Sequence, residues 1–476
     1  MNFEAVIGLE IHVEMKTKSK MFSSSANNFD SNVNENISPL DFAFPGTLPV
    51  VNKEAVRKAI RVCNALHMDI DQEVWFERKN YFYSDLPKGY QITQQFRPIG
   101  SNGYLVIDLE NGEQKRINIE RLHMEEDTCK QLHFRDYTLL DYNRAGVPLV
   151  EIVSRPEIKN GTEAMKYVEE IKNIVTYADV SDGKMEEGSL RCDVNISIMP
   201  CGSTKFGTKV EIKNLNSTSN IQKAIDFEIQ RQTKLILKGL PVEQETRRYD
   251  DVKKETVLMR KKTDAIDYKY FTDPNIAPIY LSDDFVKDAI DTCPELLRAK
   301  KTRFEEQYGL NSYDIDLLLT NKLVANFYEE VAQNCKHFKL VANWINVDIM
   351  SHLNSTKKGI EDFEITTKDL AILINAAGEN KISSKQAKEI FVKGIKGENI
   401  EKLVKDSGSS LISNEDELLS MIKSLIDANP QGVEDYRNGK DRVVGFIVGQ
   451  LMKKTQGKAN PGVASKLIIQ DLKSRL

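Results

Sequence analysis

Four short stretches of this chain alternate strictly between apolar and polar residues, the pattern of a β-strand with two different faces. They are Gly8–Glu14, Arg121–Asp127, Leu190–Ile198 and Val210–Asn214. An ordinary solvated strand face favours Thr, Lys, Ser and Gln, whereas these polar faces carry carboxylates, imidazoles, an Arg and an Asn. Such groups hold hard cations and phosphates. The pattern therefore predicts a metal and phosphate site built on several strands.

Residues 1 to about 290 are predicted to mix short strands and turns with helices such as Lys53–Leu66 and Gly161–Ala178. Isolated strands with polar faces favour a large antiparallel sheet over a doubly wound one. From about residue 293 almost every segment has helical spacing, and Pro294 is expected in the first turn of a helix. The next predicted helices are Ser312–Leu319, Lys322–Asn334, Phe338–Leu353, Thr367–Ala377 and Ser383–Val392.

A third unit is predicted to begin near residue 405, where Lys405–Ser410 has the composition of a linker. Three helices should follow, at Glu415–Ala428, Asp441–Thr455 and Gly462–Leu476, and Gly445 and Gly449 should let the middle one pack closely. The predicted fold class is α+β. It comprises a large, mostly antiparallel sheet domain (1–292), a helical bundle domain (293–404) and a small all-α tail domain (405–476).

Composition narrows the class of protein. The 476 residues exceed one ordinary core, and 40% apolar residues with a mean hydropathy of -0.43 fit a soluble protein. The N-terminus has no signal-peptide pattern, and Val443–Met452 is about half the length that spans a bilayer, so we expect a cytoplasmic protein without a membrane partner. The six cysteines contain no C-x-x-C pair, which argues against a zinc ribbon and a disulfide framework.

The net charge of -5 is unevenly distributed. From residue 437 to the end there are nine Lys or Arg against two Asp. A basic end on an acidic protein suggests contact with a polyanion, and the alternative is a solvated helical face. Charge alone does not choose between them.

Two apparent motifs are rejected. Gly202–Lys209 lacks the Gly-Lys-Ser/Thr order of a P-loop and no long helix follows, so we expect a hairpin turn between the third and fourth strands. The three serines at 23–25 have no nucleophile-elbow context and are expected in a loop.

Lys79–Gln95 is rich in Tyr, Asp, Lys and Gln, and such a loop can close over a polar ligand. A surface hairpin with Tyr81 and Tyr83 packed is the alternative. Arg144 has a planar fork suited to phosphate or carboxylate, and a structural salt bridge competes with that interpretation.

The polar faces are most informative as a set. Like charges such as Glu10, Glu125 and Glu211 repel one another in a buried site unless cations neutralise them. If the strands are neighbours, a hard divalent ion is the expected occupant, with Arg191 and Lys213 adding positive charge for phosphate.

At this point the chain resembles a known family. The resemblance lies in Gly8–His12, Lys79–Gln91, His123–Asp127, Asn143–Ile152, Gly188–Asn195 and Glu211–Asn214. These segments resemble the GatB family, the B subunits of bacterial aspartyl/glutamyl-tRNA amidotransferases, in order along nearly the whole chain. Val444–Pro461 resembles that family's C-terminal tRNA-binding domain.

The resemblance implies an enzyme, a carbon–nitrogen ligase with glutamine as nitrogen donor. Members of this family use ATP and Mg²⁺ to phosphorylate the side-chain carboxylate of misacylated Glu-tRNA(Gln) or Asp-tRNA(Asn). Ammonia from a separate amidase subunit then displaces phosphate, and a third, small subunit makes the complex a heterotrimer. This chain lacks a Gly/Ser-rich amidase signature, which agrees with ammonia arriving from a partner.

The resemblance also implies site residues. The expected metal ligands are Glu10, His12, Glu125, Glu151, Asp193 and Glu211, and the expected catalytic residues are Glu10, His12, Glu125 and Lys213. The expected ATP- or substrate-binding residues are Tyr81, Asp85, Lys88, Tyr90, Asn143, Arg144, Arg191, Asn195 and Asn214. Lys453, Lys454 and Lys458 are expected to bind tRNA. The oxygen-rich set suits Mg²⁺, and the His leaves Mn²⁺ or a water-bridged contact open.

One departure from the family concerns zinc. Many relatives carry four cysteines of a zinc knuckle in the region matching Phe22–Pro49, where this chain has Ser23, Ser25, Ser38 and Asp41. We therefore predict no structural zinc. The competing functional hypothesis is a non-catalytic tRNA-binding protein with a remnant polar pocket, which would not need the carboxylate set.

Overall fold

The computed structural model describes residues 2–28, 30–261, 267–408, 415–437, 441–455, 459 and 461–475. It divides into two compact units, Met1–Leu297 and Arg298–Leu476. The first contains the sheets and the second is helical, so the predicted α+β class is confirmed.

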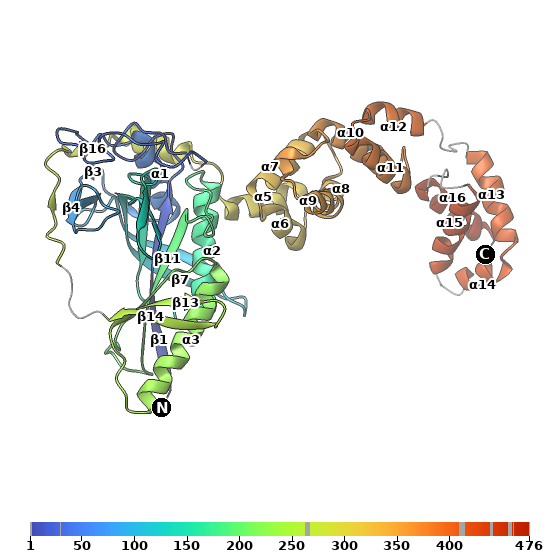
Figure 1. Ribbon diagram of the computed structural model, residues 1–476. Helices are drawn as coiled ribbons and strands as arrows, with labels where there is room; N and C mark the ends of the chain where they lie inside the picture. Colours follow the sequence, from blue (N-terminus) through green and yellow to red (C-terminus); the bar gives the residue numbers. More distant parts are fainter. Residues whose placement is uncertain are drawn as a thin grey trace. The chain divides into compact units, whose positions relative to one another are not determined.

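A large sheet organises the first unit (Figure 1). It has nine strands in the order β14-β13-β12-β11-β1-β10-β7-β6-β2. Neighbouring strands run antiparallel except for β12 and β13, which run parallel, so the predicted antiparallel sheet is confirmed. The strands are β1 (Phe3–Glu14), β2 (Asp69–Ile70), β6 (Gly100–Asp108), β7 (Gln114–Glu126), β10 (Pro148–Ser154), β11 (Leu190–Pro200), β12 (Val210–Lys213), β13 (Glu245–Asp250) and β14 (Glu255–Lys261).

Helices cover one face of this sheet. Helix α1 (Lys53–Ala65), α2 (Gly161–Tyr177) and α3 (Thr218–Leu237) begin at side-chain caps from Asn52, Asn160 and Ser217. Their buried residues join the apolar side of β1 in one core, in which Leu9 and Ile11 are buried. The prediction did not include α3 or α4 (Asp283–Asp291).

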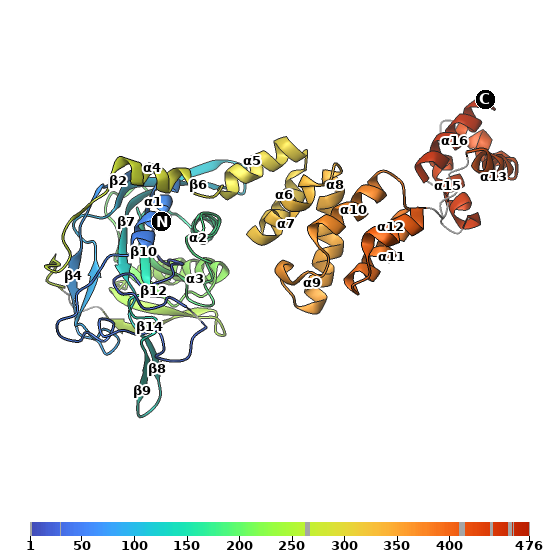
Figure 2. The ribbon, with the colours of Figure 1, turned by 90° about the horizontal axis from the view of Figure 1, so that it is seen from above.

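Smaller elements border the sheet. Strands β4 (Glu77–Asn80), β5 (Tyr90–Thr93) and β15 (Phe271–Thr272) form a three-stranded sheet, and β3 (Glu73–Val74) pairs with β16 (Ile279–Tyr280). Strands β8 (Lys130–His133) and β9 (Thr138–Asp141) form a hairpin that extends away from the rest of this unit (Figure 2). The segment 201–209 joins the antiparallel strands β11 and β12, which confirms the predicted hairpin connection.

Helices make up the second unit, with some boundaries that differ from the prediction. Pro294 precedes the first helix instead of lying in its first turn, and Phe338–Leu353 is divided by a π-helical segment. Lys405 is helical, so the predicted linker is wrong up to residue 408, while Ser409 and Ser410 lie outside the described residues. The helices here are α5 (Leu297–Tyr308), α6 (Ser312–Leu319), α7 (Lys322–Gln333), α8 (Phe338–Asn343), η1 (Trp344–Ile349), α9 (Met350–Thr356), η2 (Ile360–Asp362), α10 (Thr367–Gly378), α11 (Ser384–Ile395) and α12 (Ile400–Gly408).

The last helices share a core of their own, which includes Leu418, Ile447 and Ile468. Gly445 and Gly449 are exposed, and a Cβ at either would meet nothing within 4 Å, so the predicted close packing there is wrong. The helices are α13 (Glu415–Asp427), α14 (Pro430–Arg437), which was not predicted, α15 (Arg442–Lys454) and α16 (Pro461–Ser474). Among the described residues, no helix combines the length and apolar character needed to cross a membrane. The division near residue 405 stays a prediction.

Candidate functional site

The predicted polar strand faces lie side by side. The four predicted strands belong to one run of neighbours in the sheet, β12-β11-β1-β10-β7. The predicted site required these strands to be close together, and they are. Glu10 lies opposite Asp193, and His12 lies between Arg191 on one neighbour and Glu151 on the other. Because side chains alternate along a strand, these groups project from the face opposite the helices.

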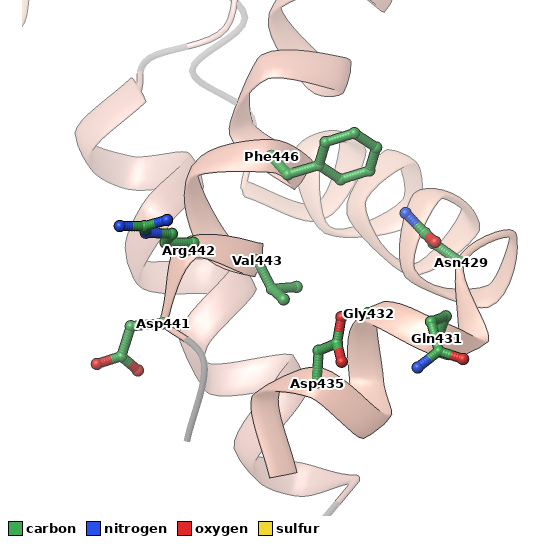
Figure 3. A pocket seen from close by; sticks show the side chains of 8 residues that line it. All are labelled: Asn429, Gln431, Gly432, Asp435, Asp441, Arg442, Val443 and Phe446. Carbon is green, nitrogen blue, oxygen red and sulfur yellow. The ribbon is translucent and has the colours of Figure 1, made fainter. Parts of the chain in front are cut away.

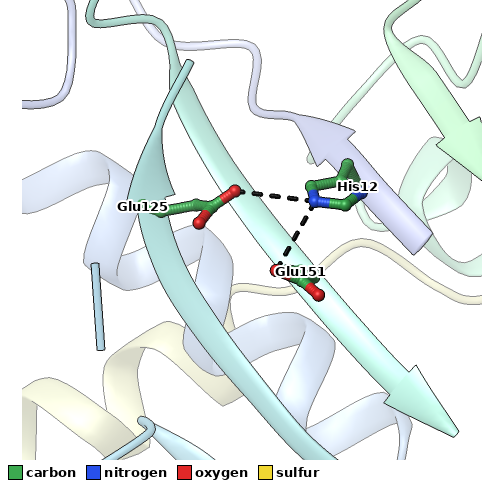
Figure 4. A group of neighbouring side chains, drawn as sticks. All are labelled: His12, Glu125 and Glu151. Atoms are coloured by element: carbon green, nitrogen blue, oxygen red, sulfur yellow. Dashed lines mark ion pairs between the residues drawn. The ribbon is translucent and has the colours of Figure 1, made fainter. Parts of the chain in front are cut away.

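His12, Glu125 and Glu151 form the tightest group of potential metal ligands (Figure 4). His12 Nε2 lies 3.4 Å from Glu151 Oε2 and 3.7 Å from Glu125 Oε1. One ligand atom from each residue falls within 4.8 Å of the others, the one such group among the described residues. They come from β1, β7 and β10, so the site depends on strands that are distant in the sequence.

His123 belongs to this group although it was not among the predicted ligands. Its Nε2 lies 2.9 Å from Glu151 Oε2 and 3.6 Å from Glu125 Oε2. Its Nδ1 is buried and has no hydrogen-bond partner within the described part of the chain. The sequence could have indicated His123 as a ligand, because it lies on the same predicted strand face as Glu125.

The electrostatics of this group fit a cation. Burial disfavours both imidazolium ions, but Glu151 and Glu125 outweigh it and raise the pKa of His12, and that of His123 to about 9. The two histidines in turn hold the pKa of Glu151 well below its usual value against the effect of burial. The buried carboxylates thus favour positive charge at this position. A divalent ion can supply that charge, because metal ligation requires neutral His and ionised carboxylate.

A second cluster lies on β11, β12 and β1. Lys213 Nζ lies 2.6 Å from Asp193 Oδ2 and 3.3 Å from Glu211 Oε1. Asn195 Nδ2 donates to Glu10 Oε1 at 2.8 Å. Burial opposes the charge of Lys213, but the two carboxylates raise its pKa. The six predicted ligands are therefore divided between two places. His12, Glu125 and Glu151 form the triad, whereas Glu10, Asp193 and Glu211 lie around the Asn195 amide and the Lys213 ammonium group.

Arg191 marks a third part of the face. Its guanidinium lies 2.6 Å from Asp127 Oδ2, and Arg144 Nε lies 3.5 Å from the same oxygen. Burial and the charge of Asp127 raise the pKa of Glu14 to about 8. Arg144 also donates to the carbonyls of Thr128 and Cys129, each at 3.0 Å, which supports its structural interpretation.

The segment after β4 reaches the site through β7. Lys88 pairs with Glu126, and Ile92 N donates to the same carboxylate at 3.0 Å. Thr93 Oγ1 donates to Glu125 Oε2 at 3.3 Å. The aromatic ring of Tyr90 lies 4.0 Å below the Arg78 guanidinium.

Several predicted binding residues have other partners. Asp85 accepts from Thr128 Oγ1 at 3.1 Å, and its Oδ1 is buried without a partner among the described residues. Asn143 bonds to the backbone of Asn32 and Asn36 at 2.7 and 2.8 Å, so it supports that loop. Asn214 occupies the left-handed region with a φ of 60° just after β12.

The region in which many relatives carry a zinc knuckle holds a hydrogen-bonded cluster around Asp41 in this chain. The hydroxyls of Ser25 and Ser38 donate to Asp41 Oδ2 at 2.7 and 2.9 Å, and Ser23 Oγ donates to Asp41 Oδ1 at 3.0 Å. Lys20 Nζ lies 3.4 Å from the same carboxylate, and both side chains are buried. The four residues named for this region therefore meet in space, joined by hydrogen bonds to Asp41, which also pairs with Lys20. The absence of zinc stays a prediction.

The tail presents the predicted tRNA-binding lysines. Lys453 and Lys454 are exposed in the last turn of α15, and Lys458 lies outside the described residues. A cavity of about 620 Å³ opens between α14 and the start of α15 (Figure 3). Asn429, Asp435 and Phe446 are among the residues that line it.

Comparison with known proteins places these features in a family. Residues 5–287 match the family described as GatB/GatE catalytic domain, and residues 326–472 match the family described as GatB domain. Proteins named as the B subunit of aspartyl/glutamyl-tRNA(Asn/Gln) amidotransferase, from Geobacillus thermodenitrificans, Bacillus velezensis and Mycoplasma capricolum, are each 47% identical over 100% of both chains. The catalytic-domain match alone covers more than half of the sequence, and the chain belongs to the GatB family.

Proposed function

We propose that this chain is the GatB subunit of a tRNA-dependent amidotransferase and that its sheet face phosphorylates the substrate. The substrate would be the side-chain carboxylate of Glu-tRNA(Gln), Asp-tRNA(Asn) or both, with ATP as phosphoryl donor. The observation that carries the proposal is the convergence of His12, Glu125 and Glu151 beside the Lys213 cluster. The names of the full-length relatives support the tRNA substrate and a complex of several subunits.

The chemistry requires an activated carboxylate, because an oxide ion is a poor leaving group. A carboxylate oxygen of the substrate would attack the γ-phosphorus of ATP, and ADP would leave. Ammonia would then attack the acyl carbon and lose a proton. The bond from that carbon to the bridging oxygen would break, and phosphate would leave with this oxygen. Phosphoryl transfer depends on positioning and on neutralising negative charge, which this polar face can supply.

The contacts of each side chain suggest its role in the proposed reaction. His12, Glu125 and Glu151 would hold one divalent ion, Mg²⁺ or Mn²⁺, which would neutralise charge on the phosphates. Lys213 would face the phosphates as a fixed cation, because Asp193 and Glu211 hold its ammonium group. Glu10 would stay oriented by its hydrogen bond to Asn195. His123 would orient Glu151 from the other side.

Partners would complete the reaction. Ammonia would come from glutamine through a separate amidase subunit, with a small third subunit making the complex a heterotrimer. The exposed Lys453 and Lys454 would contact tRNA phosphates.

The competing function, a non-catalytic tRNA-binding protein, would keep the tail but not need a buried carboxylate and imidazole group. Such a group costs stability unless it is neutralised, which favours the catalytic alternative.

The test is ADP release by the chain co-purified with its partner subunits, in the presence of glutamine and Mg²⁺. ADP formed with Glu-tRNA(Gln) or Asp-tRNA(Asn), but not with correctly charged Gln-tRNA(Gln), would support the kinase step. Tight tRNA binding without tRNA-dependent ADP would instead support the non-catalytic alternative.

A further inference from the structure

A row of five aromatic rings lies along one border of the first unit. Successive ring centroids are about 6 Å apart, from Tyr83 to Tyr81 (6.1 Å), Tyr268 (5.8 Å), Tyr270 (6.0 Å) and Phe96 (6.1 Å). Tyr83 and Phe96, at the two ends, are 61% and 68% exposed, and the three central tyrosines are half-buried. The row is thus accessible along its length and is anchored at its centre.

Two segments distant in the sequence build this aromatic row. One carries Tyr81 and Tyr83, and the other carries Tyr268 and Tyr270. Asn80, at the end of β4, contributes no ring but holds the second segment in place. Its backbone N donates to the Tyr268 carbonyl at 3.0 Å, and its Nδ2 donates to the Lys269 carbonyl at 2.7 Å. Just after Tyr270, β15 pairs with β4, so the tyrosines are fixed on both sides of Lys269. Their spacing therefore follows from backbone pairing rather than from flexible loops.

Lys79 adds a positive charge to the middle of the row. Its Nζ lies 5.0 Å from the ring centroid of Tyr268 and 5.8 Å from that of Tyr81. Among the described residues it forms no ion pair, unlike Arg78, which lies 2.7 Å from Asp273. An ammonium group held between aromatic rings, with no carboxylate of the described residues within 4 Å, is placed to bind an incoming anion.

The aromatic row adjoins the candidate site. Thr93, on the strand that pairs with β4, donates to Glu125. The charge of Glu125 also acts on Lys79 and Tyr81, since it raises the pKa of both groups, although burial opposes this for Lys79 and adds to it for Tyr81. A polymer lying along the row would therefore pass close to the triad.

We propose that the aromatic row binds the unpaired 3′ nucleotides of the tRNA, whose bases stack on Tyr83, Tyr81, Tyr268 and Tyr270 while Lys79 contacts a backbone phosphate. This inference rests on the proposed tRNA substrate and assigns a place to its reacting end. Aromatic side chains with a basic group are the usual platform for single-stranded nucleic acid, because every base has a face that stacks.

The extent of the row favours several nucleotides over one. A single adenine, as in ATP, covers one or two rings, whereas five rings in series, each about 6 Å from the next, extend over several nucleotides. An apolar peptide would also fit aromatic rings, but it would leave the Lys79 charge without a partner. An oligonucleotide satisfies both the rings and the ammonium group.

The experiment uses the full chain and uncharged tRNA(Gln) whose 3′-terminal adenine is replaced by a fluorescent analogue that is quenched on stacking. We expect quenching with the unmodified chain and its loss in Tyr268→Ala, with affinity weakened roughly 5- to 150-fold. Tyr268→Phe should retain both signals, because the ring is kept. Tyr83→Ala, at an exposed end, provides a second variant with little effect on folding.

The matched control is Tyr104→Ala, because Tyr104 stacks on His67 at 4.5 Å outside the row. It should leave quenching unchanged, and tRNA trimmed of its 3′ nucleotides should bind the unmodified chain and Tyr268→Ala equally. Unchanged quenching in both Tyr268→Ala and Tyr83→Ala would overturn the inference. So would weakened equilibrium binding of ATP with unchanged affinity for the 3′ end. The quenching readout needs neither ATP nor an aminoacyl group, so failure of the kinase proposal would not affect it.

Discussion

His123 Nε2 lies 2.9 Å from Glu151 Oε2, on the side of that carboxylate that faces β7. His12 approaches the same oxygen from β1 at 3.4 Å. Glu151 is therefore held between two imidazoles on the two strands that flank its own. This arrangement makes Glu151 the centre of the proposed metal site and His123 the residue that orients it.

His123→Phe should weaken divalent-ion binding by about 10- to 100-fold, because a carboxylate ligand loses the partner that orients it. The measurement is calorimetric titration with Mn²⁺. His133→Phe is the matched control, since His133 is exposed on the β8–β9 hairpin. Equal affinities in the two variants would show that His123 does not position the ligand.

Glu125→Gln should lower ATP-dependent amidation by about 100-fold or more, because it removes a charge from the proposed phosphoryl-transfer site. Binding of tRNA should be retained, since no phosphate contact is lost. Glu120→Gln changes an exposed residue of the same strand and should behave like the unmodified chain. Full activity of Glu125→Gln would contradict the proposed metal triad.

Asp41→Ala should lower the free energy of unfolding by about 3–5 kcal/mol, because it leaves Lys20 as a buried charge without its ion-pair partner. Urea denaturation measures this, with the exposed Asp30→Ala as control. We also expect the purified chain to contain no stoichiometric zinc. Zinc bound by Ser23, Ser25, Ser38 and Asp41 would contradict that prediction.

Lys453→Ala combined with Lys454→Ala should weaken tRNA binding and reduce the slope of log affinity against log salt by roughly 2. The physical reason is that two fewer phosphate charges are neutralised. Lys253→Ala with Lys254→Ala, an adjacent exposed pair in the β13–β14 turn, is the matched control. If both double variants bind alike at every salt concentration, the basic end is only a solvated face.

Glu364 should make the helical unit sensitive to acid. A hydrogen bond from Lys358 lowers the pKa of Glu364 to about 2, from an ordinary value of 4.5. Because the folded pKa is depressed, its stabilisation is complete above pH 4.5 and is lost as the pH falls through about 2. Glu364→Gln should therefore cost up to about 1 kcal/mol at pH 6, and the cost should shrink as the pH falls through about 2. The measurement is chemical unfolding at several pH values, with exposed Glu361→Gln as control. If the difference in free energy of unfolding between Glu364→Gln and the unmodified chain is the same at every pH, the prediction is wrong.

Local patterns determined much of the secondary structure. Alternation correctly placed Leu9 and Ile11 in the core and the polar residues of β1 on the other face, because the side-chain period of a strand is a local property. The predicted start of the helix Ser383–Val392 agrees with the capping box at Ser383, whose hydrogen bonds reach only three residues along the chain. Gly445 shows the limit, because a glycine permits close packing without requiring it.

The sequence by itself determined which residues share a face of their strand, and family resemblance supplied the proposed chemistry. Only the tertiary structure decided that β10 lies between β1 and β7, which brings Glu151 between His12 and His123. It also separated Lys213 and its carboxylates from that triad. Strand order and register depend on contacts between segments far apart in the chain. A local period carries no information about which strand becomes the neighbour.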